Sequence, residues 1–221
     1  MVELVPVIEL GHYDTGISAP KAGPFWKNSM EWDQFYTAYY AKAGFADPLP
    51  TYLPGSSFCR IEDLSDRNLQ KLVKDHTKDM REGKYTREEA SAFFGGYVLR
   101  LNENDKYFPQ CCGDLSDIQY WQKLAYEGEL TFYQGHPVPA ISITSNRIIF
   151  DFTVDEFEEG FVPPVIERTI EVNQAELATA VEKVKKQLEN FSNKLMAINL
   201  SESLGVSDID NLLVWGDQVN I

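Results

Sequence analysis

One stretch near the C-terminus constrains the fold of this chain more than any other feature. Between residues 174 and 197, apolar side chains recur at alternating spacings of four and three residues, which places them on one face of an α-helix. These residues are Leu177, Val181, Val184, Leu188, Phe191 and Leu195. Asn173 and Glu176 have the spacing of a capping box that starts a helix. An apolar stripe of this length has to be buried against another part of the protein. Packing of the helix on a sheet is the more common way to bury it.

Strand patterns elsewhere in the chain can supply that sheet. Isoleucines mark a buried face over 140–144 and 147–153, and Ser145-Asn146 between these segments suits a hairpin. Further strands are predicted over 2–10, 97–101, 129–133 and 165–172, and further helices over about 30–43, 65–82, 86–94, 116–126 and 207–215. A regular alternation of strand and helix is missing, and no Gly/Ser-rich linker divides the chain. We therefore expect an α+β fold, with residues 1–221 as a single domain. Its mainly antiparallel sheet is packed by several helices, including one long C-terminal helix.

Composition and charge narrow the classes of partner. The chain has 221 residues, 43% of them hydrophobic, and a net charge of −14 that lies mostly in residues 111–221. Such a field repels nucleic acid and attracts a basic protein. No run approaches the roughly 20 apolar residues of a membrane span. The first ten residues lack the basic start of a secretory signal, and three cysteines make no disulfide framework. These observations predict a cytoplasmic protein that binds neither nucleic acid nor membrane, and they leave the oligomeric state open.

The familiar catalytic signatures are absent from the sequence. There is no GxxxxGK[ST], no GxGxxG, no GxSxG, no HExxH and no CxxC. Their absence favours a protein that is not an enzyme, and we expect no cofactor.

An unusual local feature is Cys111-Cys112-Gly113-Asp114, which lies just before a predicted helix. Backbone N–H groups at a helix start favour a thiolate, so either cysteine could act as a nucleophile if His12 or His136 lay nearby. One alternative function is therefore a small cysteine/histidine-dependent hydrolase or transferase. Burial of one cysteine and packing of the other in the turn explain the motif without chemistry, so we expect no catalytic residue here.

The histidines also raise the question of a metal. His12 and His136, with Asp14 or with either cysteine of the pair at 111–112, could ligate a divalent ion. No two of these residues have a local ligand spacing, and the sequence does not show that their loops meet. We therefore expect no metal site.

The predicted helix at 30–43 carries an aromatic face. Its members are Trp32, Phe35, Tyr36, Tyr39 and Tyr40. Tyrosine hydroxyls need partners or water, so part of this face could border a cleft. Core packing is the more common use, and a small-ligand carrier built on this helix is a further alternative.

The segment 151–161 carries the leading functional hypothesis. Its acids are Asp151, Asp155, Glu156, Glu158 and Glu159, with Phe157 and Phe161 among them. Charged residues at the rim of a protein–protein interface speed association with a partner of opposite charge. Aromatic side chains that become buried in the interface anchor the bound partner. In general character, a small acidic single-domain chain without a catalytic signature is similar to bacterial immunity proteins that neutralise basic toxin domains. The resemblance implies a non-enzymatic, inhibitor-like module whose acidic face binds a basic protein.

Overall fold

The computed structural model describes residues 1–154 and 159–217, and it confirms the α+β fold. The strands are β1 (Val2–Glu9), β2 (Phe58–Arg60), β3 (Gly95–Leu101), β4 (Asn104–Tyr107), β5 (Ala140–Thr144), β6 (Arg147–Asp151) and β7 (Thr169–Asn173). The helices are α1 (Ser29–Lys42), α2 (Asp66–His76), α3 (Lys78–Arg81), α4 (Ile118–Tyr126) and α5 (Gln174–Ser201). Single helical turns span Arg87–Glu89, Leu115–Asp117 and Asn211–Trp215.

The strands form two antiparallel sheets. The first has the order β2-β1-β3-β4 and the second the order β5-β6-β7. The predicted hairpin over 140–153 is confirmed, because β5 pairs with β6 from Ala140 opposite Asp151 to Thr144 opposite Arg147. Ile148 and Phe150 of β6 are fully buried, so one face of this hairpin contributes to the core.

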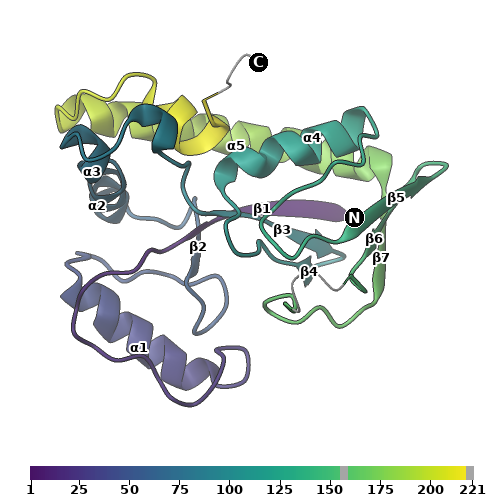
Figure 1. Cartoon of the computed structure of the whole chain (residues 1–221), viewed down its shortest axis with the longest axis horizontal. Coiled ribbons are helices and arrows are strands. Elements are labelled where there is room, and N and C mark those ends of the chain that lie inside the picture. The colour runs from purple at the N-terminus through teal and green to yellow at the C-terminus, as the bar shows by residue number, and fades with distance from the viewer. Residues whose placement is uncertain (155–158, 218–221) are drawn as a thin grey trace.

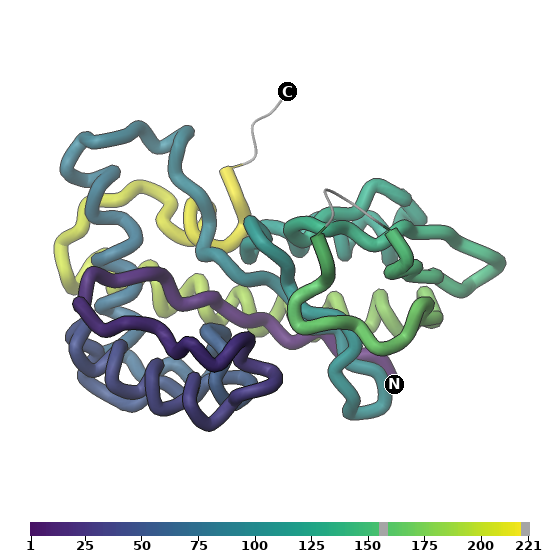
Figure 2. Tube along the Cα trace, turned by 60° about the horizontal axis from the view of Figure 1, so that its bottom comes forward, coloured from purple at the N-terminus to yellow at the C-terminus, as the bar shows by residue number. Residues whose placement is uncertain are grey.

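The long helix α5 organises the core, as its stripe predicts. All six apolar residues of the stripe are buried, and the Asn173 side chain accepts a hydrogen bond from the N–H of Glu176 at 3.1 Å. Helices α5 and α4 run side by side (Figure 1), and α5 also packs against β1. The tube in Figure 2 shows α1 at one end of the molecule, far from the β5–β6 hairpin at the other end.

Two predicted helices are shorter in the structure. The helix predicted over 65–82 is interrupted at Thr77, whose hydroxyl donates to the carbonyl of Val73 at 2.8 Å and accepts from Arg81 Nε at 3.0 Å. Threonine side chains that bond back to the preceding turn bend helices. The predicted helix 86–94 is only the turn at Arg87–Glu89, because the chain then extends so that Phe93 is buried.

The strand predicted over 129–133 is wrong, and β2 and β4 were not predicted. Residues 129–133 are irregular. Phe132 is buried against Trp121 and Phe150, so a loop with one inward aromatic side chain produced the alternating pattern. In the part of the chain that the structure describes, no helix is both long and apolar enough to cross a membrane.

Candidate functional site

Two loops that are distant in sequence meet at the cysteine pair. The backbone N–H of His136 donates to the carbonyl of Cys111 at 3.0 Å, and that of Gln110 donates to the carbonyl of Gln134 at 3.0 Å. The loops approach closely at Gly135, where φ is +77° and a Cβ would lie 2.3 Å from the carbonyl oxygen of Gln110. Only glycine fits such an approach, so Gly135 sets the distance between His136 and the cysteines.

A buried glutamine fixes the second loop. Gln134 is fully buried, and its Oε1 accepts hydrogen bonds from the N–H of Tyr97 and from Nε1 of Trp121, each at 2.9 Å. Breaking such a buried pair leaves unsatisfied polar atoms, which costs about 1–3 kcal/mol. The loop that carries His136 is therefore anchored directly to the core.

A second buried glutamine brings in a third segment. Gln110 Oε1 accepts from the N–H of Val162 at 2.8 Å, and Gln110 Nε2 donates to the carbonyl of Val162 at 3.1 Å. This two-way pairing holds residues 159–162 beside the cysteine loop. Glu159 is thereby placed next to His136.

The result is a cluster of four side chains, Cys111, Cys112, His136 and Glu159, which we call the thiol–imidazole cluster. The two Sγ atoms are 3.5 Å apart, and both sulfurs and one ring nitrogen of His136 lie within 4.8 Å of one another. Nδ1 of His136 lies 2.9 Å from Oε2 of Glu159. Both cysteines are exposed, so reagents in solvent can reach them.

The hydrogen bonds in the cluster raise the pKa values of His136 and Cys111. The Glu159 carboxylate, and then a hydrogen bond with Cys112, raise the pKa of His136, which favours the imidazolium. The hydrogen bond with Cys112, and then partial burial, raise the pKa of the Cys111 thiol, which keeps that thiol protonated. Cys112 thus has the sulfur of Cys111 at 3.5 Å and the imidazole of His136 as neighbours, and either sulfur can donate to the other.

The backbone at Cys112 is strained. Its φ is +68°, a left-handed conformation that costs a non-glycine residue roughly 1–2 kcal/mol. Strain of this kind gathers at functional sites, where the surrounding structure holds it in place. Here it turns the side chain of Cys112 toward the same side as that of Cys111.

The same residues fit a soft metal ion. Two thiolates bound to a tetrahedral Zn²⁺ at about 2.3 Å stand roughly 3.8 Å apart, close to the 3.5 Å between the sulfurs here. Metal-bound histidines usually donate through their other ring nitrogen to a carboxylate, a backbone carbonyl or water. His136 lies against Glu159 through Nδ1, which leaves Nε2 for a metal ion. Cys111, Cys112 and His136 could therefore act as ligands, although no metal site is expected from the sequence.

The other candidate histidine, His12, lies elsewhere, and so does His76, which is not a candidate. His12 is exposed, and its Nδ1 lies 3.1 Å from the hydroxyl of Tyr39 on α1, so it does not join the cysteines. Nε2 of His76 lies 2.9 Å from the carbonyl of Ser91, and burial lowers the pKa of His76.

The predicted partner face is only partly described. Asp155, Glu156, Phe157 and Glu158 lie outside the described residues. Asp151 accepts hydrogen bonds from the N–H and the hydroxyl of Thr153, and Glu159 is exposed but pairs with His136. Phe161 is 8% exposed and packs against Tyr107 and Phe152, so its ring belongs to the core.

Sequence reasoning missed the parts of the site that depend on contacts between segments. The sequence pattern assigns Glu159 only to the acidic partner-binding face, and it assigns no role to Gln110 or Gln134. Each glutamine is next to a candidate residue or its loop glycine, in Pro-Gln-Cys and Gln-Gly-His, but a glutamine in such a turn carries no signal of burial.

No family model, no curated protein and no solved structure matches this chain.

Proposed function

We propose that the protein is a cysteine-dependent hydrolase or transferase with Cys112 as its nucleophile. The observation that carries the proposal is the placement of the His136 imidazole between the carboxylate of Glu159 and the thiol of Cys112. A thiol activated by a histidine, which a third group orients, is the general arrangement of nucleophilic catalysis.

Each group of the cluster has a role in such a reaction. The Cys112 thiolate attacks a carbonyl carbon, and the His136 imidazolium gives its proton to the leaving group, which leaves a thioester on the sulfur. His136 then takes a proton from water or from an acceptor alcohol or amine, and that oxygen or nitrogen displaces the Cys112 thiolate, which restores the starting thiolate and imidazolium. Glu159 orients the ring and stabilises its charged form, while the Cys111 S–H donates to the thiolate.

Alkylation of the native protein tests the nucleophile. We expect iodoacetamide at pH 6 to label Cys112 first, and the variant His136→Ala to slow that labelling roughly tenfold, because the imidazolium that stabilises the thiolate is lost. Glu159→Gln should slow it to a smaller extent. Peptide mapping by mass spectrometry gives the rate at each cysteine, and His12→Ala is the matched control, since His12 is exposed and lies apart from the cysteines.

The acyl-transfer step has its own measurement. With p-nitrophenyl acetate we expect a burst of p-nitrophenolate of about one equivalent per chain, which Cys112→Ser abolishes and Cys111→Ser retains. Equal labelling of both cysteines, indifferent to His136→Ala, would contradict the proposal. So would stoichiometric zinc in the purified protein that blocks both thiols until EDTA removes it, which would assign the cluster to a metal ion.

A second candidate is the acidic module that binds a basic protein. The net charge of −14 supports it, together with the five acids between residues 151 and 159 that no basic residue interrupts. Acidic residues that serve only solubility can be spread over the surface. Clustering them in one segment brings like charges together, and these repel one another. In this proposal the segment steers a basic partner to the surface beside β6.

Charge neutralisation tests this second candidate. The triple variant Asp155→Asn, Glu156→Gln, Glu158→Gln leaves Glu159 and its bond to His136 intact. For a partner captured from native lysate at low salt, we expect association at least about tenfold slower and less dependent on salt, because steering acts over roughly 8–10 Å at physiological ionic strength. If neither the substitutions nor added salt changes the association rate, the proposal is wrong and these acids are only a solvated surface.

A further inference from the structure

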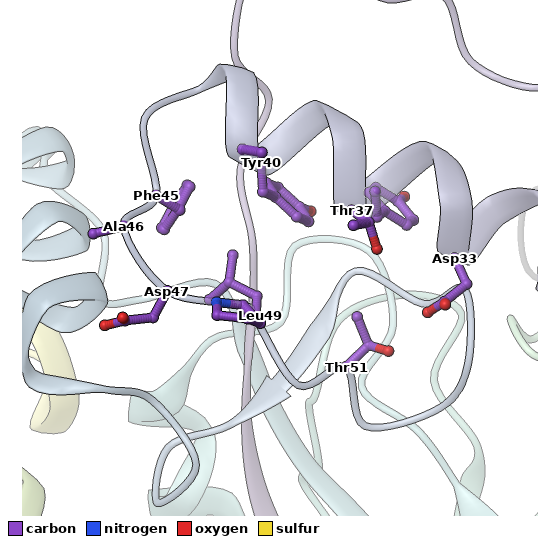
Figure 3. A pocket seen from close by; sticks show the side chains of 11 residues that line it. Asp33, Thr37, Tyr40, Phe45, Ala46, Asp47, Leu49 and Thr51 are labelled. Carbon is purple, nitrogen blue, oxygen red and sulfur yellow. The ribbon is translucent and has the colours of Figure 1, made fainter.

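A cavity beside α1 shares no lining residue with the thiol–imidazole cluster. It has a volume of about 290 Å³ and lies between α1 and the loop that follows it. Figure 3 shows α1 above the cavity and the loop below it, with Asp33 and Asp47 at opposite ends. This volume is at the lower end of the range for small-molecule sites, so it suits a compact ligand.

The two walls of the cavity differ in chemistry. Asp33, Thr37 and Tyr40 line it from α1, and their spacing of four and then three residues puts them on one face of the helix. The loop contributes Phe45, Pro48 and Leu49 among other residues. A ligand in this cavity meets polar groups along the helix and apolar groups along the loop.

The hydroxyl of Tyr40 is the most specific feature of the polar wall. Tyr40 is 3% exposed, and its hydroxyl oxygen is buried with no hydrogen-bond partner among the residues that the structure describes. Figure 3 shows the ring extending from α1 into the space above Leu49, between Phe45 and Thr37. A buried hydroxyl without a partner costs free energy, so a bound molecule that supplies a hydrogen bond there is favoured.

The charged residues around the cavity indicate which charge a ligand should carry. Asp47 is occupied, because it accepts hydrogen bonds from Ser65 Oγ at 2.6 Å and from Arg67 Nε at 3.1 Å. Asp33 is exposed at the other end, and within residues 1–154 and 159–217 it makes no ion pair. No lining residue is basic, and the Lys71 ammonium lies 5.3 Å from the centroid of the Phe45 ring, which is at the end of the cavity away from Asp33 (Figure 3). Asp33 therefore offers an open carboxylate to a cation at its own end.

Aromatic rings reinforce this preference. Tyr36 also lines the cavity, and its ring stacks on that of Tyr40 with centroids 5.3 Å apart and planes at 7°. Phe45 meets Tyr40 edge-on at 5.6 Å. The faces of tyrosine rings attract ammonium groups and pack well against aromatic ligands.

We propose that this cavity binds a small organic amine with an aromatic body and an oxygen at its far end, its ammonium at Asp33 and its oxygen at the hydroxyl of Tyr40. Seven residues of helix separate these two groups, a rise of about 10 Å. The ligand lies along α1, with its ring between Tyr36 and Leu49. The site is independent of the proposed reaction at Cys112.

Calorimetric titration with three related compounds tests the site. Tyramine carries both the ammonium and the oxygen, phenethylamine lacks the oxygen, and tyrosol lacks the ammonium. We expect tyramine to bind most tightly. Tyr40→Phe should weaken tyramine roughly fivefold to tenfold and leave phenethylamine unchanged, since one hydrogen bond is lost. Asp33→Asn should weaken both amines about threefold and leave tyrosol unchanged.

Folding of the variants is a separate check and a matched control is available. Tyr40→Phe should keep or raise the urea midpoint of unfolding, because it removes a buried hydroxyl that has no protein partner. Glu31→Gln, an exposed change on α1 outside the cavity lining, should leave binding unchanged. It should lower the urea midpoint of unfolding only slightly, because Glu31 lies in the first turn of the helix. No saturable binding of tyramine at millimolar concentration, or equal affinity in the wild type, Tyr40→Phe and Asp33→Asn, would overturn the proposal.

Discussion

Replacing Leu188 by alanine should lower the free energy of unfolding by about 2–5 kcal/mol. Leu188 is fully buried in the apolar stripe of α5, the helix that packs against both α4 and β1. Truncation removes the apolar surface that the side chain buries and leaves a cavity that neighbouring side chains fill only in part. Urea unfolding followed by tryptophan fluorescence measures the change.

The adjacent residue is the control for this prediction. Glu189 is exposed on the same helix, and Glu189→Ala should change the free energy of unfolding by no more than about 0.5 kcal/mol. If Leu188→Ala and Glu189→Ala have equal effects, the stripe of α5 does not hold the core together and the account of the fold given above fails.

Asp117 should make the protein less stable as pH rises from about 4 to 8. This residue is 4% exposed, and burial raises its pKa from 3.8 to about 8. Between these two values the carboxyl group is protonated in the folded protein and ionised in the unfolded chain. Unfolding therefore releases a proton, and the free energy of unfolding falls by up to roughly 1.4 kcal/mol per pH unit.

The variant Asp117→Asn separates this effect from all other titrations. Asparagine keeps an oxygen for the N–H of Asp114, which donates to Asp117 Oδ2 at 3.0 Å, but it cannot ionise. We expect the stability of the wild type relative to this variant to decline steadily from pH 4 to pH 8 in urea titrations. Parallel pH profiles for the two proteins would refute the prediction.

A second aspartate gives a control of opposite sign. Hydrogen bonds from Thr153 lower the pKa of Asp151, so its contribution is present above pH 3.8 and is lost as pH falls below it. Asp151→Asn should therefore change the pH profile only in acid, and Asp117→Asn should change it from pH 4 upward.

Elements defined by short-range patterns could be predicted from the sequence. The period of α5, its cap at Asn173 and the alternation in β5 and β6 all arise between residues a few positions apart, so the α+β class follows from them. A short alternating pattern can arise from a strand or from a loop with one buried side chain, and the prediction failed where the loop was the cause. Phe132 gives residues 129–133 the alternation of a strand although the backbone there is a loop.

The candidate site could be predicted only in part. Residue type makes Cys111, Cys112 and His136 candidates, but it makes His12 a candidate on the same grounds, and His12 lies against Tyr39 instead. Their chemistry is a property of side chains, which the sequence shows directly. Their distances depend on how separate segments pack.

The tertiary structure alone decided which of these residues meet. His136 reaches the cysteines because Gln134 is anchored by Tyr97 and Trp121 in the core, and Glu159 reaches His136 because Gln110 pairs with the backbone of Val162. These hydrogen bonds join residues 13 to 52 positions apart. No periodicity or local spacing encodes them, because they form only when the hydrophobic core brings their segments together.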